Sequence, residues 1–284
     1  FYGAVDLKDL IIARDYQDFE TLISTSYPYV YAEEKTGECI EELKDYSEDS
    51  IPVLSNDNKI LGVITAQDLV EAVDEEMGDD YAKLAGLTAE EDLNEPFKDS
   101  VKKRLPWLLL LLVLGLVVSS VVSIFEGVVQ QITLVVAFQS LILDMAGNVG
   151  TQSLAVTIRV IMDEALSKKD ERKLIFKEMR VGFTNGMILG VLAFVAIGVY
   201  ILVFKGKSVP FSFSVSGCIG ISLLFAMVVS SLVGTVVPLF FKKINIDPAV
   251  ASGPLITTVN DLVAVVSYYG IVWILLINIL QLVE

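Results

Sequence analysis

Two acidic residues lie inside long hydrophobic segments of the sequence, where a charged side chain is expensive. Asp144 lies within residues 132–162, and Asp261 lies within residues 254–283. A charge at the centre of a membrane helix costs about 2.5–3.5 kcal/mol on insertion scales, so such residues tend to be functional. Arg159, about four helical turns from Asp144, is too distant to neutralise it. An unpaired carboxylate that faces a pore attracts cations, so both acids are candidate cation ligands.

The residues beside these two acids are small or carry neutral oxygen atoms. Carboxylate and neutral oxygen ligands, without sulfur or imidazole, suit magnesium, calcium or manganese. The chain has no histidine, which argues against a zinc site, a haem site and a histidine general base. Small residues let helices approach closely, and a Gly-Pro step is predicted to break a helix and free backbone carbonyls. The candidate residues are Gly147, Asn148, Gly150 and Gln152 near the first acid, and Gly253, Pro254, Thr257, Thr258 and Asn260 near the second.

Magnesium, one of these cations, makes a particular demand on a pore. It gives up its water ligands reluctantly, so a pore for magnesium should be wide and held by few carboxylates. One Asp261 from each chain of a symmetric dimer would meet that need. The alternative is that Asp261 caps a helix or bonds to a neighbouring segment. An enzyme is disfavoured, because no pair of nucleophile and base can be built here without histidine.

Five hydrophobic segments must position these residues. Each is close to or longer than the roughly 20 apolar residues that a membrane-crossing helix needs. The second is predicted to be interrupted at residues 147–150. The segments are residues 105–125, 132–162, 181–204, 215–241 and 254–283.

Lysine and arginine in the loops predict the orientation of these segments. Eleven such residues lie before the first segment, between the second and third, and after the fourth. The opposite side carries only Lys205 and Lys207. Because basic residues favour the cytosolic side, we expect a multi-pass protein of the cell membrane with its N-terminal part in the cytosol and its C-terminus outside.

The N-terminal part is strongly acidic. Residues 1–99 hold 26 of the 36 acids and 7 of the 21 bases, a net charge of −19. A surface of this charge repels nucleic acid and attracts cations. The densest run, residues 74–80, has five carboxylates in seven residues. It reads as a cation-sensing site or, alternatively, as a solvated linker.

Residues 51–69 have the pattern strand, turn, strand and helix. Two β-rich runs flank the turn residues 55–59, and Thr65 is the expected N-cap of the helix with Asp68 at its third position. This unit resembles the end of a CBS domain, a module that often binds adenine nucleotides. Residues 3–10 repeat the same ending, so we expect the end of one CBS repeat and a second whole repeat, with the natural chain starting further upstream. The alternative is another small α/β regulatory domain.

The order of CBS domain, acidic linker and five spans resembles the MgtE family of magnesium channels. The runs 144–152 and 247–261 carry the resemblance. It implies a homodimer with the pore on the dimer axis and Asp261 as the filter ligand, with Thr257 and Thr258 beside it. It also implies pore-lining positions and acids that bind regulatory magnesium. The pore-lining residues are Gly147, Asn148, Asp247, Gly253 and Asn260, and the regulatory residues are Asp68, Glu71, Glu76, Asp79 and Asp80.

The sequence thus predicts an α-helical integral membrane protein with five transmembrane helices, preceded by an α/β CBS region. We expect the CBS region over residues 1–66, an acidic linker helix over residues 67–99 and a pore domain over residues 100–284. The predicted function is a passive magnesium channel gated by cytosolic magnesium, because no nucleotide-hydrolysis motif is present. The alternatives are a transporter for cobalt or manganese, and a membrane-anchored nucleotide sensor that transports nothing.

Overall fold

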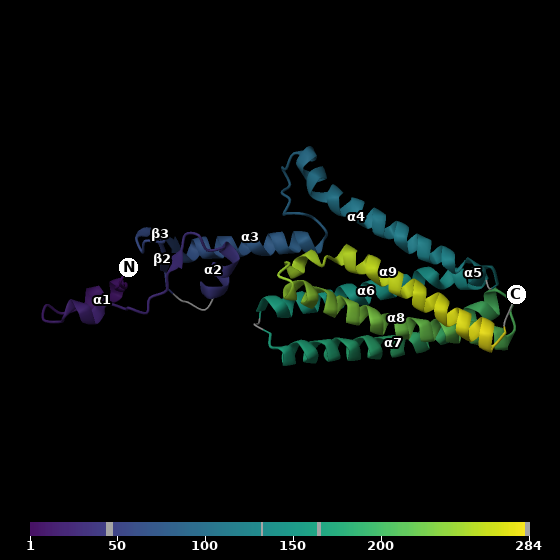
Figure 1. The fold of residues 1–284 in the computed structure, drawn as a ribbon. Helices are drawn as coiled ribbons and strands as arrows, with labels where there is room; N and C mark the ends of the chain where they lie inside the picture. Colours follow the sequence, from purple (N-terminus) through teal and green to yellow (C-terminus); the bar gives the residue numbers. More distant parts are fainter. Residues whose placement is uncertain (44–47, 132, 164–165, 282–284) are drawn as a thin grey trace. The chain divides into compact units, whose positions relative to one another are not determined.

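The computed structural model describes residues 1–43, 48–131, 133–163 and 166–281. Its internal contacts divide the chain into two compact units, Phe1–Asp79 and Asp80–Glu284. The first unit holds a small sheet with short helices, and the second holds long helices that run side by side (Figure 1). Each unit is described in turn below.

The first unit is built on a three-stranded sheet with the order β1, β2, β3. Strand β1 pairs in parallel with β2, which pairs antiparallel with β3 across the turn at residues 55–59. Val30, Leu43 and Ile51 form the buried core. The predicted strand, turn, strand and helix are therefore confirmed. The elements are α1 (Leu7–Ile12), η1 (Phe19–Leu22), β1 (Val30–Tyr31), α2 (Thr36–Leu43), β2 (Ser50–Leu54), β3 (Ile60–Thr65) and α3 (Ala66–Leu84).

Helix α3 begins with the capping arrangement that the sequence predicts. The backbone N–H of Asp68 donates to Thr65 Oγ1 at 3.2 Å, and the backbone N–H of Thr65 donates to Asp68 Oδ2 at 2.8 Å. These reciprocal bonds satisfy two backbone donors that the first turn of a helix leaves without partners. They also hold the pKa of the Asp68 carboxyl below its usual value, because the charged form accepts the bonds from Thr65.

The acidic linker is a shorter helix than the predicted range 67–99. Helix α3 ends at Leu84, and two residues later Gly86 takes a positive φ of 84°. The N–H of Leu87 bonds to the carbonyl of Ala82, and that of Gly86 bonds to the carbonyl of Lys83. This is a Schellman ending, which needs a residue such as glycine in the left-handed conformation. Composition alone extended the helix too far, because the stop signal is a single glycine.

Ion pairs hold the segment between α3 and the next helix. Arg104 donates through Nε and Nη2 to the two carboxylate oxygens of Glu91, at 2.9 and 2.8 Å. Lys103 Nζ donates to Glu95 Oε2 at 2.9 Å. The pKa of Glu91 is lowered, mainly by hydrogen bonds from Ser100 and Arg104. These acids therefore pair with bases in the first turns of the next helix (Phe97–Ile124), whereas the sequence predicted that the linker helix continues here.

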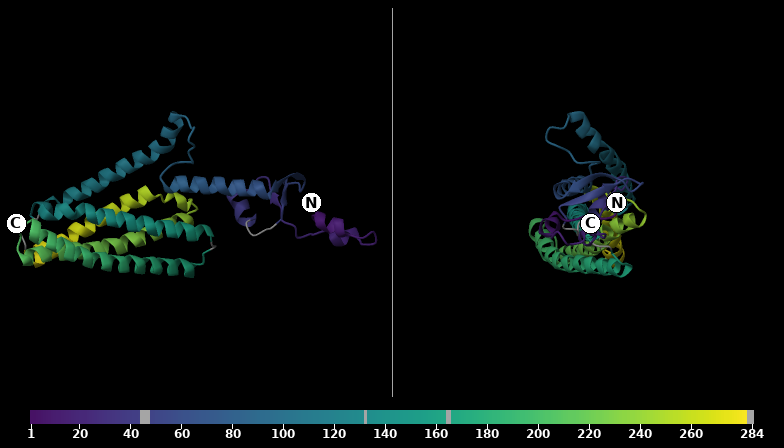
Figure 2. Two further views of the ribbon diagram at one scale, coloured as in Figure 1. Left: turned by 180° about the vertical axis from the view of Figure 1, so that it is seen from behind. Right: turned by 90° about the vertical axis from the view of Figure 1, so that its left-hand side faces the viewer.

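The second unit contains five helices within the described residues that are long and apolar enough to cross a membrane. The predicted fold class is therefore confirmed. Helices α6, α7, α8 and α9 pack together, and α4 diverges from them towards its N-terminal end (Figures 1 and 2). The elements are α4 (Phe97–Ile124), α5 (Glu126–Gln131), α6 (Thr133–Asp163), α7 (Lys168–Phe204), α8 (Val209–Lys243), η2 (Pro248–Val250), α9 (Gly253–Val272) and the π-helical turn η3 (Trp273–Ile279).

Two predicted breaks in the membrane helices are wrong. Helix α6 runs without interruption through residues 147–150. Its glycines do not break it, because each packs against a neighbouring helix. Gly253 and Pro254 start α9 rather than break a helix: Ser252 Oγ accepts from the N–H of Leu255 at 3.4 Å, and proline occupies the first turn. Proline is well suited to that position, because the N–H it lacks would have had no helical partner.

Glycines bring α7 and α8 into close contact. A Cβ atom at position 190 would lie 2.8 Å from the carbonyl oxygen of Gly220, and one at position 220 would lie 2.7 Å from the carbonyl oxygen of Gly190. Gly182 and Gly186 meet α8 in the same way. Glycine spaced four residues apart lies on one helix face and allows the backbones to touch. This interface forms a rigid base for α6 and α9.

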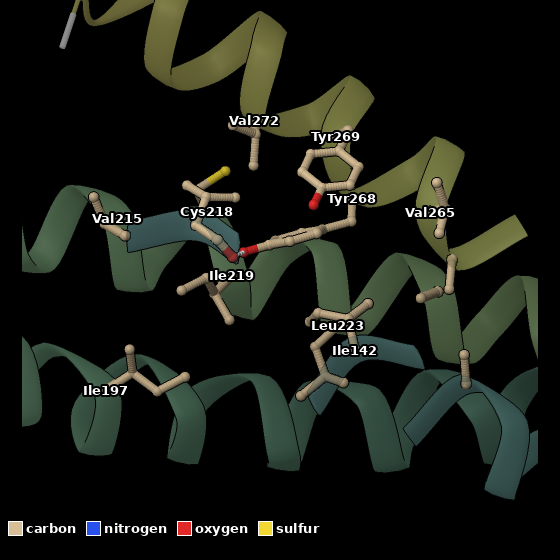
Figure 3. Close-up of a cluster of buried hydrophobic side chains, with 14 of the residues drawn as sticks. Ile142, Ile197, Val215, Cys218, Ile219, Leu223, Val265, Tyr268, Tyr269 and Val272 are labelled. Atoms are coloured by element: carbon tan, nitrogen blue, oxygen red, sulfur yellow. Dashed lines mark hydrogen bonds between the residues drawn. The ribbon is translucent and has the colours of Figure 1, made fainter. Parts of the chain in front are cut away.

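Two tyrosines join α9 to α6 within the main hydrophobic core. The hydroxyl of Tyr268 donates to the carbonyl oxygen of Val135 at 2.8 Å, and that of Tyr269 donates to Gln139 Oε1 at 2.5 Å. Figure 3 shows both rings among buried aliphatic side chains that include Ile142 and Leu223. Each ring buries a large apolar surface while its hydroxyl stays bonded. The register of α9 against α6 is thereby fixed, two turns beyond Asp261.

Candidate cation site in the membrane helices

Helices α6 and α9 meet through the runs 144–152 and 247–261. A Cβ atom at position 147 would lie 3.1 Å from Thr257 Cγ2, and one at position 150 would collide with Asn260 Nδ2. Gly147 and Gly150 therefore leave room for the side chains of α9. The structure brings the small residues of one run against the polar residues of the other.

Asp261 lies half-buried in the third turn of α9. It is too far from the start of the helix to cap it, so that alternative is wrong. Within the described residues, its carboxylate has no hydrogen-bond or ion-pair partner. A carboxylate at membrane depth without a protein partner needs water or a cation beside it. Asp261 is therefore the strongest candidate ligand in the helical unit.

Two threonines complete the polar face around Asp261. Residues 257 and 258 precede Asp261 by four and three positions, so all three lie on neighbouring parts of one helix surface. Thr257 Oγ1 donates to the carbonyl of Gly253, and Thr258 Oγ1 donates to that of Pro254, both at 2.9 Å. Because their hydrogens are used inside the helix, the hydroxyls present oxygen lone pairs outward. That polarity suits a cation or its water ligands.

Asn260 does not lie where the sequence placed it. It was predicted to line a pore, yet its side chain is fully buried against Gly150 and Ile256. Neither its oxygen nor its nitrogen has a hydrogen-bond partner among the described residues. The prediction failed because Asn260 is adjacent to Asp261 in sequence, and successive residues on a helix point about 100° apart. Asn260 instead fills the space that Gly150 leaves.

The end of the linker lies against the start of α9. Lys83 Nζ donates to Asp247 Oδ2 at 2.7 Å and lies 3.6 Å from Asp80 Oδ1. At Gly253, another predicted pore-lining residue, an added Cβ atom would lie 3.4 Å from the carbonyl oxygen of Leu84. Leu84 also packs on the buried cluster that contains Ile256. Two acids assigned from sequence to different sites, Asp80 and Asp247, therefore share one lysine.

On α6, Asp144 and Asn148 are both exposed, one turn apart. Asn148 lines a groove of about 400 Å³ between α6, α7 and α8, together with Gln152 and Asn185. Asp144, like Asp261, has no hydrogen-bond or ion-pair partner in the part of the chain that is described. Asp144 and Asn148 thus lie on the exposed side of α6.

Comparison with known proteins agrees with this geometry. Residues 139–271, which run from α6 into α9, match the family MgtE, described as a divalent cation transporter. Over these residues the membrane helices resemble the MgtE family. Residues 18–75 match the CBS domain. The resemblance seen in the sequence is confirmed, and the family description agrees with a transporter rather than an enzyme.

Curated relatives cover both the CBS region and the MgtE domain. The chain is similar to proteins named magnesium transporter MgtE from Enterococcus faecalis (35% identical over 274 residues), Bacillus subtilis (32% over 269) and Thermus thermophilus (28% over 278). These alignments cover 95–96% of the chain. They cover only 57–59% of the relatives' own lengths. The chain therefore spans less than two thirds of the proteins it resembles.

The five predicted regulatory acids all lie on α3. Asp68 is engaged in the capping arrangement, and Glu76 lies beside Gly37 of α2. Asp80 lies beside Lys83. Within the described ranges of the chain, no three acidic or other metal-binding side chains come together to hold an ion. The regulatory residues, which also include Glu71 and Asp79, stay a prediction.

Sequence reasoning missed two residues of these sites. Lys83 was not predicted, because the interpretation of this segment was based on the acidic run before it. A base shortly after that run, at the C-terminal end of the helix, would have been the signal. Asn185 is an uncharged polar residue within the third hydrophobic segment. The criterion that found Asp144 and Asp261 was formal charge, which an amide does not carry.

Proposed function

We propose that the protein carries magnesium ions across the cell membrane into the cytosol through a passive pore in its MgtE domain. The observation that carries this proposal is the Asp261 face of α9, a half-buried carboxylate flanked by Thr257 and Thr258 hydroxyls with their oxygens outward. The names of the relatives support magnesium as the ion.

The pore forms between two copies of the chain. A single Asp261 gives one carboxylate, and magnesium usually keeps several waters while one or two carboxylates hold it. Two copies related by a twofold axis would set two Asp261 residues across one opening. The ion would then pass as a hydrated cation, bound tightly enough to enter and weakly enough to leave.

Cytosolic magnesium closes this pore through the linker. The acids of α3 repel one another unless cations lie between them, and the same helix ends in the contact of Lys83 with Asp247. When magnesium is abundant, it neutralises α3 and the end of the linker stays on the start of α9. When magnesium falls, repulsion loosens α3, releases Lys83 and opens the pore. The basic loops support a cytosolic side for the CBS region, and an adenine nucleotide at that region stays a prediction.

Magnesium uptake into liposomes tests the transport proposal. Asp261→Ala should lower uptake by about 10- to 100-fold, because a lost charged contact is worth about 1.5–3 kcal/mol. Asp57→Asn, in the exposed hairpin turn, removes the same charge elsewhere and should leave uptake unchanged. Full uptake by Asp261→Ala would reject the filter assignment. Competition by cobalt or manganese distinguishes the alternative ions, and absence of any flux in the wild type would favour a sensor.

The gating proposal has its own measurement. Neutralising Glu76 and Asp79 together with amides should weaken inhibition of uptake by magnesium inside the liposomes, because α3 would no longer need cations to stay in place. Glu33 and Glu34, which lie outside α3, provide the matched pair of substitutions to amides. Equal inhibition in wild type and the α3 variant would argue against the sensor role.

A further inference from the structure

The groove beside α6 is lined by polar side chains, whereas a second groove, between α7 and α8, is lined by glycine and apolar side chains alone. The volume of the groove beside α6 is about 400 Å³, and three carboxamides line it: Asn148 and Gln152 from α6 and Asn185 from α7. The remaining lining is apolar, with Ile188 and Met227 among it. Three amides from two helices therefore open into one volume within the spanning segments.

These amides lack protein partners. Within the described residues, no side-chain hydrogen bond involves Asn148, Gln152 or Asn185. A polar group without a hydrogen bond in an apolar environment costs several kcal/mol. Amides at membrane depth are tolerated where they line a water-filled space. The groove is therefore expected to hold water.

Its size fits a hydrated ion. Six waters at about 30 Å³ each occupy about 180 Å³, so one hexahydrated magnesium and some further waters fit into the groove. Amide oxygens accept hydrogen bonds from the water ligands of a cation and leave its first shell intact. A site of this kind would favour an ion that keeps its waters.

A carboxylate lies in line with the amides. Asp144, Asn148 and Gln152 follow one another at intervals of four residues, so they form a polar stripe about 12 Å long on one side of α6. Asp144 is exposed at one end of the stripe. Its charge raises the local concentration of cations. Gly147, which precedes Asn148 in the sequence, packs against Thr257 of α9. The groove and the Asp261 face therefore lie on neighbouring sides of α6.

We propose that this groove is a second position for a hydrated divalent cation, beside the Asp261 face, with Asn185 as a hydrogen-bond acceptor for its waters. The inference rests on the proposed magnesium transport. Cations held on two sides of one helix repel each other, so an ion in the groove would favour the departure of an ion held at Asp261. Other occupants, namely a lipid headgroup or the surface of a second copy, are outcomes of the test.

Uptake of magnesium into liposomes by groove variants tests the site. Asn185→Leu keeps the size of the side chain and removes its amide, so uptake at low magnesium should fall by about tenfold and half-saturation should move to higher concentration. Asn185→Asp adds a charge and should move half-saturation to lower concentration. Ile188→Leu, in the same groove, is the matched control and should behave as wild type. Cobalt(III) hexaammine, whose ligands do not exchange, should inhibit Asn185→Leu less than wild type.

The outcomes separate this inference from the transport proposal. If wild type conducts and Asp261→Ala does not, yet Asn185→Leu and Asn185→Asp both match wild type, the groove site is rejected while transport stands. Loss of the dimer in Asn185→Leu, measured by size-exclusion chromatography in detergent, would assign the groove to a protein interface and overturn the proposal. An effect that follows the headgroup of the vesicle lipid rather than magnesium would overturn it as well. If Asn185→Leu does not fold, Gln152→Leu provides the same comparison.

Discussion

Glycine plays different roles in two helix–helix interfaces of the second unit. Between α7 and α8, Gly190 and Gly220 bring backbone against backbone. Between α6 and α9, Gly147 and Gly150 make room for the side chains of Thr257 and Asn260. The first contact leaves little that can move, because carbonyl groups are fixed in their helices. The second contact involves side chains that can change rotamer. It lies next to the carboxylate of Asp261, which has no protein partner among the described residues.

The hydroxyl groups follow the same division. Ser231 of α8 donates to the carbonyl oxygen of Glu178 in α7 at 2.8 Å. Because its only hydrogen is used there, Ser153 of α6 must donate to Ser231 Oγ, at 2.8 Å. On the α9 side, Asn260 is buried with neither amide atom bonded in the described structure. The closely packed interface around α8, whose hydroxyls are bonded, thus serves as a scaffold. The interface of α6 with α9 is also closely packed but holds polar groups without hydrogen bonds in the described structure, and it is the candidate site.

The largest effect is expected at Gly190. Gly190→Ala puts a methyl group 2.8 Å from the carbonyl oxygen of Gly220, so the two backbones must separate. Overpacking of this kind costs about 1–3 kcal/mol. Thermal unfolding in detergent should show a clear loss of stability, with uptake falling only as folded protein is lost. Gly115→Ala, where a Cβ meets no atom within 4 Å, is the matched control and should be neutral or slightly stabilising. Equal stability of the two variants would contradict the rigid-interface account.

Gly150→Ala should affect transport more than stability. The added methyl collides with the amide of Asn260, a side chain that can move, rather than with a backbone. The displaced amide would shift the adjacent Asp261, so uptake should fall several-fold while unfolding moves by about 1 kcal/mol. Truncating the amide in Gly150→Ala with Asn260→Ala should restore part of the uptake. A double variant no better than Gly150→Ala would show that Asn260 does not transmit the effect.

Ser231→Ala tests the bonded hydroxyls of the scaffold. It leaves the carbonyl of Glu178 and the hydroxyl of Ser153 without their partner in a buried place. Unsatisfied buried groups cost about 1–3 kcal/mol, and we expect the lower half of that range here. Chemical unfolding in detergent measures it. Ser120→Ala, whose hydroxyl bonds only within α4, should cost less; the reverse order would mean that the bond between helices adds nothing.

The linker contact is a smaller test of the same contrast. Lys83→Gln removes the ion pair with Asp247, whose side chain is 41% exposed, so the loss in stability is at most about 1 kcal/mol. If that contact favours the closed pore, half-inhibition by internal magnesium should shift about two- to fivefold upward. Lys98→Gln removes an exposed charge near the start of α4 and serves as control. The same inhibition in all three proteins would remove Lys83 from the gating account.

The contrast explains what could be predicted from the sequence. The five membrane helices follow from hydrophobic length, and the capping pair Thr65 and Asp68 from local spacing. Asp261 was found because a charge in an apolar segment is conspicuous. The burial of Asn260 could not be predicted, because it depends on which helix faces it. The pairing of Lys83 with Asp247 joins residues 164 positions apart, and no local pattern records it.

The smallest effect is expected at the start of α3, which belongs to neither interface. Hydrogen bonds from Thr65 lower the pKa of Asp68 from its ordinary value of 3.8. A carboxyl whose pKa is lower in the folded state adds stability above its unfolded pKa and loses that contribution as pH falls through the folded value. Hydrogen exchange of the first turn of α3 should therefore be faster in Asp68→Asn than in wild type at pH 6. The difference should shrink below about pH 3.8. A difference that stays constant with pH would assign the effect to the amide itself rather than to the charge of the cap.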